Sequence, residues 1–308
     1  MDMSIRFPNL DINLGHIAKS LNFFGYEITV YGMLMAAGML LGLLVVLTQA
    51  RRQNQNTNLY LGVVILSILG GVIGARAYYV AFSWELFQDQ DLNVFLNLRS
   101  GGLAIYGGIF GGMLVAFVFC CIRRVSFGRI ADIACTGLLA GQSIGIWGNF
   151  FNRASFGKYT DSLLAMQLPL NAVSSGEVTK TIREQVVNVN GTDYIQVHPL
   201  FFYESIWCLL LLVFLLIYNR RKSFQGELFL RYLAGYGLGK AVIEWLRTDT
   251  LYIPNTKIPV SLIVSVALFL ICEIVAAVRH RLARKRQILM KQQKEARYLA
   301  GEKIKQSE

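Results

Sequence analysis

Long apolar runs separated by short polar segments dominate the chain. Seven of these runs approach the roughly 20 residues that a helix needs to cross the hydrocarbon core of a bilayer. They are predicted as membrane spans over residues 28–49, 58–82, 102–122, 129–150, 199–218, 227–246 and 258–279. The sixth run is the weakest, because it contains Arg231, Lys240 and Glu244. The pattern predicts an all-α integral membrane protein with seven transmembrane helices.

The polar segments divide the chain into three regions. Residues 1–27 have a mixed composition and are predicted to lie at the membrane interface, residues 28–279 form the transmembrane domain, and residues 280–308 form a basic, helical extension. One sizeable insert, residues 151–197, is predicted to be a small subdomain outside the membrane. Within it, apolar and polar residues alternate around Asn190-Gly191, which predicts a β-hairpin.

Arginine and lysine residues gather in alternate connecting segments, and this asymmetry predicts the orientation. They occur at Arg51–Arg52, at Arg123–Arg129, at Arg220–Lys222 and throughout Arg279–Lys305. The positive-inside rule assigns these segments to the cytoplasm, so the N-terminus is predicted outside and the C-terminus inside. The net charge of +11 therefore suits anionic cytoplasmic lipid, and we do not interpret it as a nucleic-acid signal.

The composition agrees with a protein that crosses the membrane several times. Hydrophobic residues make up 54% of the chain and charged residues 16%, with a mean hydropathy of +0.45. The five cysteines all fall inside apolar runs and show no CxxC spacing. This distribution argues against a disulfide framework or a metal site, and it suits small buried hydrophobic residues.

Glycines cluster in the second and third predicted spans, several of them with GxxxG spacing. They are Gly70, Gly71, Gly74, Gly101, Gly102, Gly107, Gly108, Gly111 and Gly112. Glycines at this spacing let helix backbones approach closely in lipid. Close helix packing accounts for most of them, although glycines beside a ligand produce the same pattern.

Polar residues within the spans concentrate in the outer halves of the predicted helices. They are Tyr31, Arg76, Tyr106, Asn149, Asn152, Arg153, His198, Tyr203, Glu204, Lys240, Glu244 and Arg247. Charged groups near the middle of a membrane cost at least about 2.5–3.5 kcal/mol and usually face protein, water or a lipid head group. Their concentration at one level therefore predicts a structural network or a binding site.

The last three of these residues, Lys240, Glu244 and Arg247, are spaced i, i+4, i+7 and lie on one helix face. The structural interpretation is an ion network within this face or with Glu204. The functional interpretation is a cationic cavity open to the outer leaflet, in which arginine and lysine bind a phosphate.

The functional interpretation gives other polar residues a place in the same cavity. Arg76 adds a third cation, and Asn149 and Asn152 donate and accept hydrogen bonds around the phosphate. His198 or Glu204 moves a proton. The stretch Gly145–Gly157, which we call the signature segment, is either a helix end at the interface or part of this head-group site.

Six short motifs follow one another along residues 28–280. They are Val30–Met33, Gly74–Tyr79, Gly101–Gly108, Gly148–Asn152 with Phe156-Gly157, His198–Ser205, and Tyr236–Asp249. In this order they resemble the prolipoprotein diacylglyceryl transferase family of bacterial membrane enzymes. The resemblance implies the same topology of seven spans, with the N-terminus outside and the C-terminus in the cytoplasm.

The resemblance also implies an activity at the outer leaflet of the bacterial cytoplasmic membrane. Family members transfer the diacylglyceryl group of phosphatidylglycerol to the lipobox cysteine thiol of a preprolipoprotein, the first step of lipoprotein maturation. They use no metal and no organic cofactor. The implied catalytic residues are Lys240, Tyr106, His198, Glu204 and Arg247. The implied residues that bind the phosphatidylglycerol head group are Tyr31, Arg76, Gly148, Asn149, Asn152, Arg153 and Glu244.

Three positions depart from the family pattern. Ile146 replaces an arginine, Ala154 replaces a glutamate, and Lys240 replaces an arginine of the sixth span. Lysine keeps the charge but lacks the bidentate fork of arginine. The alternative hypothesis is therefore a weakened or inactive paralogue that binds lipid or a lipoprotein partner. A transporter is less favoured, because the two halves of the chain show no inverted repeat.

Overall fold

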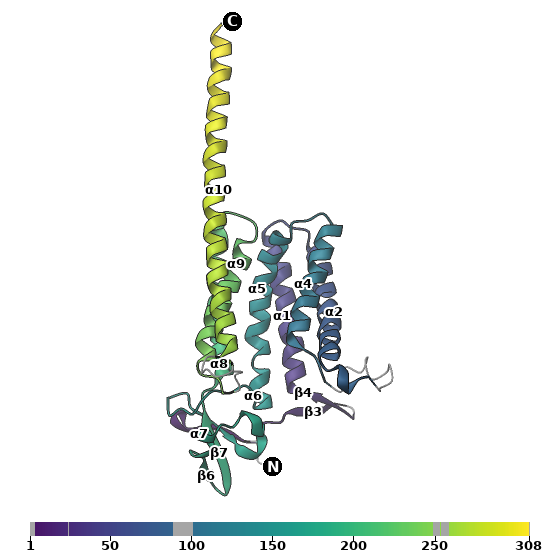
Figure 1. Cartoon of the computed structure of the whole chain (residues 1–308), viewed down its shortest axis with the longest axis vertical. Helices are drawn as coiled ribbons and strands as arrows, with labels where there is room; N and C mark the ends of the chain where they lie inside the picture. The colour runs from purple at the N-terminus through teal and green to yellow at the C-terminus, as the bar shows by residue number, and fades with distance from the viewer. Residues whose placement is uncertain (1–3, 24, 89–100, 249–252, 254–258, 308) are drawn as a thin grey trace. The chain divides into compact units, whose positions relative to one another are not determined.

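The computed structural model describes residues 4–23, 25–88, 101–248, 253 and 259–307. The chain forms two compact units. The first contains residues 1–41 and 138–308, and the second contains residues 42–137. Figure 1 shows the elements of both units.

The protein is mostly helical. The helices are α1 (Val30–Arg52), α2 (Thr57–Phe82), α4 (Ile105–Ile122), α5 (Phe127–Gly145), α6 (Gly148–Asn152), α7 (Lys180–Arg183), α8 (Leu200–Tyr218), α9 (Glu227–Glu244) and α10 (Val260–Ser307). Among the described residues, six helical segments are long and apolar enough to cross a membrane: Val30–Arg52, Thr57–Phe82, Ile105–Ile122, Phe127–Asn152, Leu200–Arg221 and Val260–Met290.

These segments make the chain a multi-pass membrane protein, and they correspond to six of the seven predicted spans. The predicted span 227–246 is present as helix α9, but it is not among the apolar segments. Its polar character comes from charged residues at Glu227, Arg231, Lys240 and Glu244. The prediction of seven spans is therefore confirmed only in part.

The mostly helical fold class is confirmed, and outside the long helices the structure contains more strands than the one predicted hairpin. Strands β1 (Ile5–Phe7), β2 (Ile12–Leu14), β5 (Met166–Pro169), β6 (Val187–Val189) and β7 (Thr192–Val197) form an antiparallel sheet. Its strand order is β2-β1-β5-β7-β6, so residues near the N-terminus and residues of the 151–197 insert share one sheet. The strands are short, and strands of three to six residues show little periodicity in the sequence.

Two hairpins belong to the same unit. Strands β6 and β7 pair with Val189 opposite Thr192, and the intervening Asn190 and Gly191 have φ angles of 52° and 82°. Two central residues with positive φ are typical of a type I′ turn, so the predicted Asn-Gly hairpin is confirmed. The second hairpin pairs β3 (Ser20–Phe23) with β4 (Tyr26–Thr29) and leads directly into α1.

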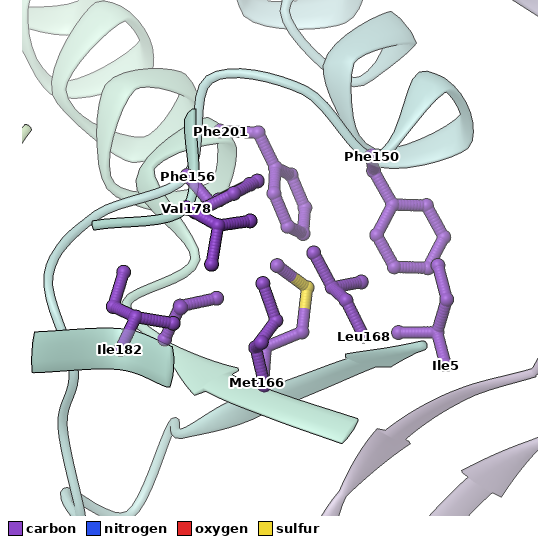
Figure 2. Close-up of a cluster of buried hydrophobic side chains, with 10 residues drawn as sticks. Ile5, Phe150, Phe156, Met166, Leu168, Val178, Ile182 and Phe201 are labelled. Atoms are coloured by element: carbon purple, nitrogen blue, oxygen red, sulfur yellow. The ribbon is translucent and has the colours of Figure 1, made fainter. Parts of the chain in front are cut away.

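A buried apolar cluster joins the sheet to the helices of the first unit (Figure 2). Its members are Ile5, Phe150, Phe156, Met166, Leu168, Val178, Ile182, Ile195, Val197 and Phe201. Large apolar side chains contribute about 1.5–3 kcal/mol each when they are fully buried. Because two phenylalanines of the signature segment and one of α8 lie in this cluster, the sheet holds both segments in place.

In the second unit, glycines bring α2 and α4 into close contact. A Cβ atom on Gly74 would lie 2.5 Å from the carbonyl oxygen of Gly107 and 2.8 Å from the Cα atom of Gly111. Only a hydrogen atom fits in such a space, as the GxxxG spacing predicts. The predicted close packing of these two helices is confirmed.

Helices α8, α9 and α10 pack side by side in the first unit (Figure 1). Helix α10 then continues as a single helix to Ser307, well beyond the level at which α9 begins. This continuation confirms the predicted helical form of the basic extension over 280–307.

Candidate active site

The end of the signature segment lies between two other segments that carry predicted site residues. The backbone N–H of Gly157 donates to the carbonyl oxygen of His198 at 3.0 Å, and the N–H of His198 donates to the carbonyl of Lys158 at 3.1 Å. On the other side, the N–H of Lys158 donates to the carbonyl of Leu246 at 2.8 Å, and Gly157 pairs with Arg247. The signature segment therefore brings His198 and Arg247 together.

Glycine at position 157 makes this three-segment junction possible. A Cβ atom there would lie 2.7 Å from the Cβ atom of His198 and 3.0 Å from the carbonyl oxygen of Leu246. Both distances are well below the 3.5–4.0 Å of an ordinary carbon contact. The Phe156-Gly157 motif was the sequence signal for this position, although the predicted site residues did not include Gly157.

Two ion pairs lie at the C-terminal end of α9, next to this three-segment junction. The Nζ atom of Lys240 is 2.8 Å from Oε1 of Glu204 on α8. Nη1 of Arg247 is 3.9 Å from Oε2 of Glu244, a buried carboxylate that also accepts a hydrogen bond from Oγ of Ser261. The expected network within this face and with Glu204 is present. Lys240 and Arg247 are therefore each paired with a carboxylate, although α9 ends at Glu244 and Arg247 lies beyond the predicted helix face.

His198 precedes α8, and its ring is half-buried. Its Nδ1 atom lies 3.2 Å from the hydroxyl oxygen of Tyr203. Burial lowers the pKa of His198 from the ordinary value of 6.5, because desolvation disfavours the charged imidazolium. The ring is therefore neutral at pH 7, and a neutral imidazole has a nitrogen that accepts a proton.

These contacts link the start of α8 and the end of α9 to the signature segment. Arg247 contacts Glu244, which is one helical turn from Lys240, and Lys240 contacts Glu204. Glu204 lies in the first turns of α8, which begins directly after His198-Pro199. The backbone of His198 is hydrogen-bonded to Gly157, and Gly157 in turn pairs with Arg247. The structure thus brings together the four residues predicted to handle charge and protons in this unit.

The start of α6 is fixed against α8 and α1. Nε1 of Trp147 donates to Oγ of Ser205 at 3.1 Å, and that hydroxyl donates to the carbonyl of Ser143 at 2.7 Å. The ring of Tyr31 packs on Gly148, where a Cβ atom would lie 2.5 Å from Cδ2 of the tyrosine. Trp147 lies in the signature segment and Ser205 in the His198–Ser205 motif, but neither was among the predicted site residues, and Ser261 lies outside the six motifs.

Asn149 and Asn152 lie on α6, whose Phe150 points into the buried cluster (Figure 2). Both asparagines are half-buried. Helix α6 ends at Arg153, a residue with a left-handed φ of 54°. The short helix therefore holds the two amides between the core of the sheet and the positions fixed by Trp147 and Gly148.

Arg153 has a different environment from the one predicted. Its side chain is only 1% exposed, and its guanidinium donates to the carbonyl oxygens of Ile17 at 2.7 Å and Phe151 at 3.0 Å. A side chain buried to this extent is not reachable by a lipid head group. Arg153 instead connects the N-terminal segment to the signature segment, so we leave it out of the proposed site.

Arg76 and Tyr106 belong to the second unit. Nη1 of Arg76 donates to the carbonyl oxygens of Gly101 at 2.8 Å and Gly102 at 3.1 Å, and its guanidinium lies 5.4 Å from the ring centroid of Phe87. Arg76 therefore connects the end of α2 to the segment before α4. Tyr106 is 66% exposed at the start of α4. Their contacts with substrate remain predictions.

The fold and this site define a multi-pass membrane protein with a charged site at the ends of its helices. Residues 19–278 match the family model described as prolipoprotein diacylglyceryl transferase. The chain belongs to this family, as its motifs indicated.

Relatives from three bacteria cover most of the chain, and each is named phosphatidylglycerol–prolipoprotein diacylglyceryl transferase. The protein of Clostridioides difficile (strain 630) is 36% identical over 74% of this chain and 82% of its own length. The protein of Bacillus cytotoxicus is 34% identical over 82% of this chain and 87% of its own length. The protein of Finegoldia magna is 32% identical over 89% of this chain and 98% of its own length.

Proposed function

We propose that this protein transfers the diacylglyceryl group of phosphatidylglycerol to the thiol of the lipobox cysteine in a preprolipoprotein. The observation that carries the proposal is the placement of two carboxylate-paired cations, Lys240 and Arg247, next to the junction at which the signature segment pairs with the backbones of His198 and Arg247. The names of the relatives favour this transferase over the alternative of an inactive paralogue.

The charged end of α9 stabilises the leaving group in this proposal. The sulfur atom attacks the glyceryl carbon, the bond from that carbon to the phosphate-ester oxygen breaks, and glycerol 1-phosphate leaves. Negative charge grows on the departing oxygen, and fixed cations at that point lower the barrier. Lys240 and Arg247 supply the cations, and their carboxylate partners hold them in position. Asn149 and Asn152 bind the head group.

His198 accepts the proton of the thiol, because the thiolate is the reactive nucleophile. In the productive tautomer, Nδ1–H donates to the oxygen of Tyr203, and this leaves the lone pair of Nε2 for the incoming proton. The lowered pKa keeps the ring neutral at pH 7. Tyr106 and Glu204 are the other two candidates for this role from the sequence.

The proposed orientation places the site at the outer leaflet of the bacterial cytoplasmic membrane. Helix α9 packs against α8 and α10, which supports its assignment as the sixth of seven spans in spite of its charges. The basic segments then lie in the cytoplasm, and the sheet with the 151–197 insert lies outside. The N-terminus is outside and the C-terminus inside.

The test uses the purified full-length protein in mixed micelles of detergent and phosphatidylglycerol with a synthetic lipobox peptide. Mass spectrometry is expected to detect a peptide enlarged by the diacylglyceryl group, and the cysteine thiol is expected to disappear. Absence of the thioether product, under conditions in which the Clostridioides difficile relative forms it, refutes the proposal.

A triple variant separates the transferase from the paralogue. Ile146→Arg, Ala154→Glu and Lys240→Arg restore the three family residues. The transferase hypothesis expects the parent protein to be active already. A triple variant that is active beside an inactive parent supports the paralogue.

A further inference from the structure

A groove runs between α8, α9 and α10 in the first unit, and its Trp207 end borders the small pocket beside Glu204 and Lys240. Its cavity volume is about 390 Å³, and it is lined by Trp207, Leu210, Leu211, Phe214, Tyr218, Arg231, Gly235, Leu238, Phe269 and Glu273. Trp207 and Tyr218 are eleven residues apart, which corresponds to about 16 Å along α8. This length matches one leaflet of a hydrocarbon core that is about 30 Å thick.

The groove is apolar along its length and open to the side. Leu210 is 60% exposed, Phe214 49% and Leu238 41%. Polar groups lie at one end, where Arg231 forms an ion pair with Glu273 and lies 5.7 Å from the ring centroid of Tyr218. The groove thus has the dimensions and polarity of a binding site for one acyl chain.

A group of exposed cations, which we call the basic cluster, begins just beyond this polar end. It consists of Arg220, Arg221, Arg279, Arg281, Arg284, Lys285 and Arg286. Arg279 is six residues beyond Glu273, about 9 Å along α10, and Arg220 follows Tyr218 by two residues. The guanidinium of Arg279 lies 5.1 Å from the ring centroid of Phe224, so the α8–α9 connection contacts α10 here.

The acidic groups near the basic cluster face other partners. Glu227 is fully buried and accepts hydrogen bonds from the hydroxyl of Tyr218 at 2.6 Å and from the backbone N–H of Ser223. His280 approaches the same carboxylate at 3.7 Å. Glu273 is paired with Arg231. The exposed cations therefore present a net positive surface beyond the polar end of the groove.

We propose that the groove and the basic cluster bind one anionic phospholipid of the leaflet at this end of the helices. One acyl chain lies in the groove, and the phosphate lies on the basic cluster. The positive-inside rule assigns this end to the cytoplasm, where clusters of Lys and Arg beside a membrane span bind anionic lipid. The proposed head-group position on the basic cluster lies at the opposite ends of α8 and α9 from Glu204 and Lys240, and Trp207 lies at the end of the groove nearest those two residues.

Trp207 provides a reporter, because it lines the groove. The experiment uses a protein that retains Trp207 as its only tryptophan (Trp84→Phe, Trp147→Phe and Trp245→Phe), reconstituted in bilayers with lipids dibrominated at mid-chain. Dibrominated phosphatidylserine, an anionic lipid that is not the proposed substrate, is expected to quench Trp207 more strongly than dibrominated phosphatidylcholine at the same mole fraction.

Charge variants then locate the head group. Arg220→Gln with Arg221→Gln is expected to reduce the preference for phosphatidylserine on the order of tenfold. Arg51→Gln with Arg52→Gln removes the same charge at the end of α1 and is expected to leave the preference unchanged. The proposal is overturned if both lipids quench Trp207 equally, or if both double variants lose the preference equally. It is also overturned if a second copy of the chain shields Trp207 from both lipids.

Native mass spectrometry provides a measurement that keeps all four tryptophans. The wild-type protein is expected to retain one phosphatidylserine molecule after detergent removal, and the Arg220→Gln, Arg221→Gln variant is expected to lose it. Retention of phosphatidylserine by both proteins refutes the site. Because neither measurement includes a lipoprotein or its transfer, failure of this proposal and failure of the proposed transferase function are distinguishable.

Discussion

The replacement of Gly157 by alanine tests whether the three-segment junction controls activity. The new Cβ atom would lie 2.7 Å from the Cβ atom of His198, 3.0 Å from the carbonyl oxygen of Leu246 and 3.1 Å from Cδ2 of Leu200. Ordinary carbon contacts require about 3.5 Å. The segment that carries His198 must therefore move by about 0.8 Å, and the segment that leads to Arg247 must move as well.

This displacement has consequences for both stability and rate. An extra methyl group in a well-packed site typically costs about 1–3 kcal/mol of unfolding free energy. A shift near 1 Å in a catalytic group lowers the rate by about 10²-fold. We therefore expect Gly157→Ala to lower kcat/KM for peptide lipidation by about one to two orders of magnitude, while the protein still folds.

The assay measures thioether formation on a lipobox peptide in phosphatidylglycerol micelles, together with the thermal unfolding of the same preparation. Gly176→Ala is the matched control in the same unit, since the nearest atom to its Cβ would be Oγ of Ser174 at 4.0 Å. This control is expected to behave like the parent. A Gly157→Ala protein with the activity and stability of the parent refutes the argument that the junction needs glycine.

Further predictions concern charge, protonation and positioning. Lys240→Gln is expected to lower kcat by about 10²-fold and Lys240→Arg to preserve most of it; equal loss in both contradicts the role of charge. Because the pKa of His198 is lowered from 6.5, the unfolded chain binds more protons near and below that pH, so stability rises with pH there. His198→Gln should flatten this slope in thermal unfolding and abolish the acid limb of kcat/KM; an unchanged pH profile contradicts both effects. Arg153→Met should lower the unfolding free energy by about 2–4 kcal/mol and leave the KM for phosphatidylglycerol unchanged. A raised KM with full stability would instead show that Arg153 belongs to the head-group site. Ser261→Ala should lower kcat a few-fold by releasing one oxygen of Glu244, and an unchanged kcat refutes the positioning role.

The parts of the fold that follow from local patterns were predictable from the sequence. Long apolar runs predicted the long helices, and Asn190-Gly191 predicted the hairpin that joins β6 and β7. Strands β1, β2 and β5 were not predicted, because each has only three or four residues. The pairing of Arg6 with Gln167, which joins β1 to β5, also links positions far apart in the chain. The sheet combines residues 5–14 with residues 166–197, and local periodicity does not predict pairing between segments so far apart.

The candidate site shows the same division between local and long-range information. The pairing of Lys240 with Glu204 was among the expected networks. The i, i+4, i+7 spacing predicted one helix face for Lys240, Glu244 and Arg247, but α9 ends at Glu244, and Arg247 instead pairs with Gly157. The burial of Arg153 was not predictable, because it depends on the carbonyl oxygen of Ile17, which is far away in the chain. A cation just beyond a span ordinarily lies at the interface, where a head group can reach it.

The three departures from the family pattern are consistent with the packing of this chain. Ile146 packs against the buried apolar cluster, so an arginine in the same orientation would place its charge among apolar side chains. Near the second departure, the carboxylate of Glu177 accepts a hydrogen bond from the N–H of Ser155 at 2.9 Å, next to Ala154. Replacing a buried ion pair by apolar residues often leaves a fold intact. The charge requirement of the reaction then falls on Lys240 and Arg247, which both retain carboxylate partners. For this reason the comparison of Lys240→Gln with Lys240→Arg decides more about activity than restoration of the two signature residues.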